Sequence, residues 1–127
     1  MERDDVAELL PLTPAVFHIL LVLAGGDAHG YAVMQEVERV TGGQMRLGPG
    51  TLYRSIYQLL EAKLIAPAEE GAPPADERRC VYRLLPRGLA VARAEAQRLA
   101  NLVRVARSRG LLEGRAASRS QRRGAMS

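Results

Sequence analysis

Apolar residues recur at helical spacing in four stretches of the chain, and this pattern predicts a mainly α-helical domain. The first stretch, residues 13–24, begins with a capping threonine and a proline, is apolar on nearly all sides, and is stopped by a Gly-Gly-Asp turn. The second, from about Gly30 to Val40, has a valine face and ends at a Thr-Gly-Gly sequence that favours a left-handed cap. Because a helix that is apolar all round must be covered, we expect the first stretch to be buried on several sides.

The third stretch, residues 47–64 (LGPGTLYRSIYQLLEAKL), predicts a helix with a marked start and two unlike faces. Its Gly-Pro-Gly-Thr opening suits a first helical turn, because proline there loses no needed N–H group. One face is apolar, formed by Leu52, Ile56, Leu59 and Leu60. The other carries Thr51, Arg54, Tyr57 and Gln58. Such a helix suits a DNA groove, since arginine can bond guanine edges and glutamine adenine edges, but an ordinary amphipathic surface helix has the same pattern.

Two short extended segments and a long helix follow. Residues 65–70 predict an edge or irregular strand, because Pro67 interrupts them. Residues 71–77 predict a loop, and residues 80–85 predict a strand with alternating side chains. Together the three segments predict a hairpin. A helix is then expected from Pro86 to about Gly110. Within it a heptad-like seam, which requires a partner helix, consists of Leu89, Ala92, Ala96, Leu99, Val103 and Ala106. The charged residues of this helix, Glu95 among them, lie off the seam.

Composition indicates one small domain with a mainly aliphatic core. The chain has 127 residues, of which 47% are apolar, with one Phe and no Trp. A core of this size is often completed by oligomerisation. The formal net charge of +4 is matched by four basic residues of the C-terminal tail: Arg115, Arg119, Arg122 and Arg123. This tail lacks an apolar pattern and is expected to be disordered. Nucleic acid is therefore an allowed partner, and the tail either adds nonspecific affinity or is inert.

Several classes of protein are disfavoured. The single Cys80 excludes an internal disulfide and fits a reducing cytoplasm. No apolar run approaches a membrane span, and the acidic N-terminus is unlike a signal peptide. His18 and His29 have no Cys or His at metal-ligand spacing, and the Gly-Pro-Gly sequence lacks the Gly-Lys-Ser/Thr of a phosphate loop. We therefore expect no enzyme activity, no metal and no cofactor.

The order of the predicted elements, three helices followed by a hairpin, is that of a winged helix-turn-helix domain. We expect an N-terminal arm at residues 1–11, the winged helix domain at 12–85, a C-terminal dimerisation helix at 86–112 and the tail at 113–127. In such a domain the third helix enters the major groove and the hairpin reaches an adjacent groove or phosphate.

At this point the chain resembles the PadR-like transcriptional regulators. The matching sequences are LTP at 12–14, HGY at 29–31, GPGTLY at 48–53, EAKLI at 61–65, the arginine pair at 78–79 and YRL at 82–84. The resemblance covers about residues 12–112 and implies a cytoplasmic homodimer, joined through its C-terminal helix, that usually represses transcription. This chain resembles the short branch with one C-terminal helix.

Two positions depart from the pattern of the PadR-like family. Leu85 stands where the family often has a threonine before the proline of the last helix, so that a side-chain cap is missing. The C-terminal helix also has no aromatic residue, so the binding of planar drugs between aromatic side chains, which some relatives use, is not expected here.

Eight residues are candidate DNA contacts. Thr51, Arg54 and Gln58 share one helical face and are assigned to the major groove. Tyr53 is expected to be half-buried with its hydroxyl on a phosphate, or else simply packed. Tyr31, at the start of the second helix, is either near a phosphate or part of a structural turn. The remaining candidates are basic and lie before the third helix or at the wing, where solvated charge is the alternative: Arg46, Arg78 and Arg79.

The sequence therefore favours a dimeric DNA-binding repressor that binds a palindromic operator in double-stranded DNA and is released by a small-molecule effector. The alternative is a winged-helix module that binds protein and not DNA.

Overall fold

The structure, a computed structural model, describes residues 6, 8–68 and 80–113. The chain divides into two compact units, the first ending at Glu95 and the second beginning at Ala96. Four helices are described: α2 (Pro14–Ala24), α3 (Gly30–Val40), α4 (Pro49–Glu61) and α5 (Pro86–Ser108). All four helices expected from the sequence are therefore present. Most of the predicted arm, the hairpin tip at 69–79 and the tail from 114 lie outside the described residues.

The strands form a three-stranded antiparallel sheet in the order β1-β3-β2. β2 (Ile65–Pro67) and β3 (Val81–Leu84) are the predicted hairpin, with Ile65 opposite Leu84. β1 (Ala28–His29) is not among the strands predicted from the sequence, and its Ala28 pairs with Tyr82 of β3. A two-residue strand has no alternation to reveal it in the sequence.

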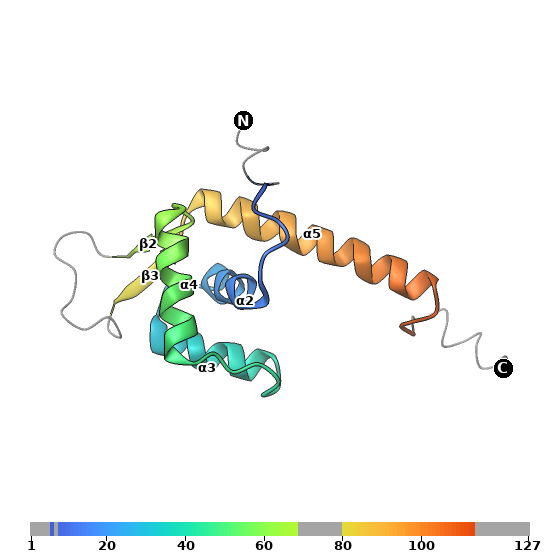
Figure 1. Ribbon diagram of the computed structural model, residues 1–127, viewed down its shortest axis with the longest axis horizontal. Helices are drawn as coiled ribbons and strands as arrows, with labels where there is room; N and C mark the ends of the chain where they lie inside the picture. The colour runs from blue at the N-terminus through green and yellow to red at the C-terminus, as the bar shows by residue number, and fades with distance from the viewer. Residues whose placement is uncertain (1–5, 7, 69–79, 114–127) are drawn as a thin grey trace. The chain divides into compact units, whose positions relative to one another are not determined.

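The core of the first unit lies around α2, which packs against α3, α4 and β3. Figure 1 shows α4 crossing α2, with β2 and β3 to one side of the two helices. Ile19 and Leu20 of α2 are completely buried, as the apolar sequence of this helix predicts. They meet aliphatic residues from every other part of the unit: Val33, Val37, Leu52, Ile56, Leu59, Ile65 and Val91. Leu21, however, is 44% exposed, so one side of α2 is open to solvent.

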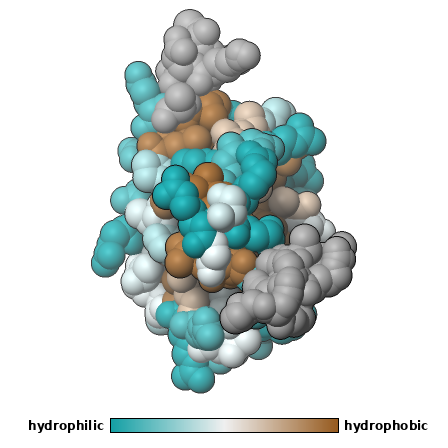
Figure 2. Space-filling model, turned by 90° about the vertical axis from the view of Figure 1, so that its right-hand side faces the viewer, coloured by the Kyte–Doolittle hydropathy of each residue, from teal (hydrophilic) through white to brown (hydrophobic). Residues whose placement is uncertain are grey.

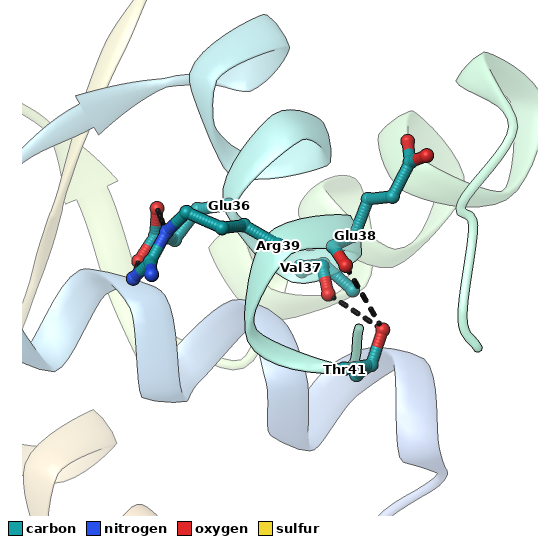
Figure 3. A network of polar contacts seen from close by, with 5 residues as sticks. All are labelled: Glu36, Val37, Glu38, Arg39 and Thr41. Carbon is teal, nitrogen blue, oxygen red and sulfur yellow. Dashed lines mark hydrogen bonds and ion pairs between the residues drawn. The ribbon is translucent and has the colours of Figure 1, made fainter. Parts of the chain in front are cut away.

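A side-chain hydroxyl fixes the turn between α3 and α4. The Thr41 hydroxyl donates to the backbone carbonyl of Val37 over 2.9 Å, with the Glu38 carbonyl at 3.3 Å (Figure 3). It also accepts the backbone N–H of Met45 over 3.0 Å. Gly42 and Gly43 follow with φ of 62° and 84°, the left-handed region that glycine adopts without strain. These bonds satisfy the last carbonyls of α3 and set the direction in which the chain leaves for α4.

The beginning of α5 lies against the beginning of β2. Gly88 is buried, and a Cβ atom at this position would be 2.1 Å from the carbonyl oxygen of Leu64. That oxygen also accepts the backbone N–H of Leu85 over 3.0 Å. Only a glycine at residue 88 permits this approach, and residues 86–95 of α5 thereby belong to the first unit.

A buried carboxylate ties α5 to the segment before α2. Glu95 is 2% exposed, and its Oε2 accepts the backbone N–H of Leu12 over 3.2 Å. In the sequence Glu95 is one of the charged residues beside the seam, and nothing in that pattern predicts its burial in the core of its own chain. A buried carboxylate retains its place only with such hydrogen bonds, since burying it alone would be costly.

The second unit contains the rest of α5 and a closing turn. Gly110, with φ of 79°, ends the helix, and the N–H of Leu111 bonds the carbonyl of Ala106 over 2.9 Å. Leu99 is half-buried, and the other large apolar side chains of this unit's described part are exposed: Leu102, Val103, Val105, Leu111 and Leu112. On the face drawn in Figure 2, hydrophobic residues reach the surface between hydrophilic ones. Among the helices of the described ranges, none is long and apolar enough to cross a membrane.

Candidate nucleic-acid interface

α4 presents a polar face to solvent and an apolar face to the core. Leu52, Ile56 and Leu59 are buried, and Ser55 is 7% exposed beside them. The outer face consists of Thr51, Arg54, Tyr57 and Gln58, all exposed. Arg54 forms no ion pair with any described residue, so its guanidinium is available to a ligand. Proline in the first turn starts this helix, and no acidic side chain occupies that turn to repel a phosphate.

The other side of α4 is locked onto α3 by Tyr53. A Cβ atom at Gly30 would be 2.5 Å from the Tyr53 hydroxyl oxygen and 3.0 Å from two ring carbons, so the ring lies directly on this glycine. The ring is half-buried, as the sequence predicts, but the hydroxyl oxygen is enclosed. The enclosed hydroxyl favours the alternative expected for this residue, plain packing between the two helices.

The start of α3 is a helix N-terminus with one exposed aromatic side chain. Tyr31 is 51% exposed there. His29 precedes the helix, and its Nδ1 accepts the N–H of Ala32 over 3.4 Å. This histidine cap is not predicted by the sequence. Tyr31 is therefore an exposed aromatic residue in the first turn of α3, next to the capping residue.

Of the predicted basic contacts, Arg46 lies within the described residues and the two wing arginines do not. Arg46 is exposed before α4, with its Nε 3.2 Å from the Glu38 carboxylate. A pair this exposed contributes little to stability, so a phosphate can replace the carboxylate. The predicted wing contacts, Arg78 and Arg79, lie outside the described residues.

The six predicted seam residues differ widely in burial. Leu89 is half-buried and Ala92 is 8% exposed within the first unit, where Ala92 belongs to the core of its own chain. In the second unit Ala96 is exposed, Leu99 and Ala106 are half-buried and Val103 is 42% exposed. Surface for a partner is thus concentrated at the C-terminal end of the seam.

Both histidines serve local backbone contacts. His18 Nδ1 lies 2.7 Å from the carbonyl oxygen of Pro14, and His29 caps α3. Within the part of the chain that the structure describes, no three His, Cys, Asp or Glu side chains gather as a metal site would require. Cys80 is half-buried at the beginning of β3.

Three helices, an antiparallel sheet and an exposed polar face on the third helix define a winged helix-turn-helix protein. Residues 19–94 match the family model described as the transcriptional regulator PadR-like family. The chain belongs to the PadR-like family of transcriptional regulators. Proteins of this family regulate transcription and are not enzymes, which agrees with the sequence analysis.

Solved structures share the fold. A PadR family transcription regulator from Clostridium difficile aligns with a TM-score of 0.63 at 20% identity, over 76% of this chain and 97% of that one. A transcriptional regulator from Clostridium thermocellum aligns with a TM-score of 0.62 at 21% identity, over 74% and 87% of the two chains. RosR of H. salinarum aligns with a TM-score of 0.58 at 26% identity, over 73% and 79%.

A similar sequence also occurs in a mobile element. The chain is 37% identical over 84 residues to a 37.1 kDa protein in transposon TN4556 of Streptomyces fradiae. The match covers 66% of this chain and 22% of that protein, so this chain corresponds to about a fifth of its relative.

Proposed function

We propose that the protein is a homodimeric repressor that binds a palindromic operator by inserting α4 into the major groove. The observation that supports this most directly is the exposed face of α4, where an unpaired Arg54 lies among exposed Thr51 and Gln58. Arginine and glutamine make bidentate bonds to guanine and adenine edges, and a groove admits one helix. Because Tyr53 fixes α4 on α3, these side chains meet the duplex as a preformed group.

Phosphate contacts would surround α4. Arg46 lies just before the helix, Tyr31 at the start of α3, and Arg78 and Arg79 at the wing in the sequence. Their proposed role is to position the protein on the duplex, since phosphate contacts supply affinity and base contacts supply specificity.

The proposed partner in the dimer is a second copy of the chain, bound through the second unit. Leu99, Leu102, Val103 and Ala106 recur at intervals of three, one and three residues, which places them on one side of α5. Leu102 is 52% exposed and Val103 42% exposed. A two-fold dimer would hold two recognition helices about 34 Å apart, one turn of DNA, and so select a palindrome.

Binding to duplex DNA should fall steeply with salt. If about six to eight phosphates are neutralised by the two copies, affinity should decrease by roughly 10³- to 10⁴-fold between about 50 and 200 mM salt. Fluorescence anisotropy with a labelled duplex, selected from a random pool, measures this directly. Equal affinity at the two salt concentrations, or binding at neither, would favour the alternative of a module that binds protein.

Arg54→Ala should relax sequence preference. A lost base-edge contact is expected to reduce discrimination by about 1–3 kcal/mol at one base pair of each half-site. The matched control is Arg46→Ala, which should weaken all duplexes alike and reduce the salt dependence. Competition between the selected duplex and single-base variants gives the ranking, and an unchanged ranking for Arg54→Ala would refute the groove assignment.

The proposed setting is the cytoplasm, where the chromosome is accessible and where the lone Cys80 stays reduced. Release from the operator would follow the binding of an effector that favours one dimer arrangement over another.

A further inference from the structure

A small apolar cavity of about 210 Å³ lies in the first unit, between the segment before α2, the beginning of α2 and the end of α4. It is lined by Leu9, Pro11, Leu12, Thr13, Val16, Gln58, Leu59, Ala62 and Leu64. None of the described lining residues carries a charge. This cavity is open to solvent on one side, where Pro11, Thr13 and Gln58 are exposed. An apolar cavity of about 150 Å³ accepts benzene, so this one has room for a molecule of roughly eight to ten non-hydrogen atoms.

Two side chains in the lining can form hydrogen bonds. The Thr13 Oγ1 accepts the N–H of Val16 over 3.2 Å, which leaves its O–H proton for another acceptor. The amide of Gln58, whose side chain is exposed, offers both a donor and an acceptor. An apolar pocket with a few polar groups at fixed places is the usual form of a small-molecule site.

We propose that this cavity binds a small uncharged organic molecule that has an aromatic or aliphatic body and one hydroxyl or carbonyl group. The absence of charge from the lining disfavours ions of either sign, because an ion that enters loses its hydration without a counter-charge. The volume excludes a peptide or a large planar drug.

The walls of the cavity include residues of α4, and the lining residue Leu12 is bonded to α5. Gln58 and Leu59 belong to α4, and Ala62 is its cap residue. On the opposite wall, the backbone of Leu12 is bonded to Glu95 of α5. A molecule in the cavity therefore contacts the recognition helix directly, at the candidate base-reading residue Gln58. That the molecule regulates operator binding rests on the proposed function, whereas its binding does not.

The binding test uses benzyl alcohol and benzoate, two probes of similar size that differ in charge. Titration of the full chain with benzyl alcohol, followed by backbone amide chemical shifts, should saturate with a dissociation constant on the order of 0.1–1 mM. The shifts should centre on Leu12, Val16, Leu59 and Leu64. Benzoate should bind at least about tenfold more weakly, because no cation faces the cavity.

Two variants fill the cavity from different walls. Ala62→Leu and Val16→Phe should each raise the dissociation constant for benzyl alcohol at least about tenfold. The control is Ala24→Leu, which makes the same change as Ala62→Leu at an exposed position outside the lining and should leave binding unchanged. Amide spectra of the unliganded variants identify any that is misfolded, and one folded filling variant suffices for the comparison.

Three results would overturn the inference: no saturable shifts in the wild-type chain, shifts centred on the exposed leucines of the second unit, or equal binding by the filled variants. A duplex titration with and without benzyl alcohol then tests regulation, where at least a threefold change in affinity is expected for the wild type and none for Ala62→Leu. If the wild type binds no duplex at all, the proposed function fails while the amide titration still decides the ligand site.

Discussion

Replacing Leu102 and Val103 together by glutamate should convert the proposed dimer into a folded monomer. Each exposed apolar side chain that a partner covers contributes about 1.5 kcal/mol or more, so a two-fold interface that loses four of them is weakened by about 6 kcal/mol, or roughly 10⁴-fold. Four carboxylates brought together across the two-fold axis add repulsion. Because the wild-type side chains are 52% and 42% exposed in the single chain, the fold of the monomer should survive.

The matched control is the pair Gln97→Glu and Asn101→Glu. It adds the same charge to the same part of α5, at exposed polar positions joined by a 3.2 Å hydrogen bond between the two side chains. Sedimentation equilibrium should report a monomer for the first pair and a dimer for the control. Affinity for the full palindrome should fall at least about 100-fold for the first pair alone. A dimer that persists with both apolar residues replaced would exclude this stretch of α5 as the interface.

Gly88→Ala should have the largest effect on stability. The added Cβ would stand 2.1 Å from the Leu64 carbonyl oxygen and 2.8 Å from a Leu84 methyl carbon, and the carbonyl is held by its bond to the N–H of Leu85. Since backbone must move to make room, the free energy of unfolding should fall by about 3 kcal/mol or more. For a domain of this size the midpoint of thermal unfolding would drop by about 12 °C or more.

Gly50→Ala provides the control for this prediction. Gly50 lies in the first turn of α4, and a Cβ there meets no heavy atom within 4 Å. Alanine should raise the free energy of unfolding by about 0.5–1 kcal/mol, because it restricts the unfolded chain and favours a helix. Thermal and urea unfolding of the three proteins give the comparison. A loss below about 1 kcal/mol in Gly88→Ala would mean that α5 does not approach Leu64 closely.

Local signals in the sequence were sufficient for the helices. Each helix boundary is marked by residues within one or two turns of it, so the bounds follow from neighbouring residues. The signals are the threonine and proline at the start of α2, the glycines after α3, and the prolines at the start of α4 and α5. The polar face of α4 was predictable for the same reason, since helical spacing alone separates Arg54 and Gln58 from Leu52 and Ile56.

The features that could not be predicted from the sequence depend on contacts between residues far apart in the chain. Glu95 reads as one more charged position of a long surface helix, and only the position of Leu12 explains its burial. Gly30 and Gly88 read as ordinary helix-start glycines until Tyr53 and Leu64 are placed against them. The sequence left two alternatives open for the hydroxyl of Tyr53, because wheel position gives a side chain's direction but not what covers its end.

The pairing of β1 with β3 has a consequence for the order of folding. Ala28 and Tyr82 are neighbours in the sheet, but α3, α4 and the hairpin tip separate them along the chain. While the protein is being synthesised, α2, α3 and α4 emerge first, and local contacts among them form quickly. The sheet must wait for β3, and Gly88 and Glu95 follow later still. The nascent helices therefore expose apolar surface, including the part of α2 that β3 will cover, until nearly the whole first unit has left the ribosome.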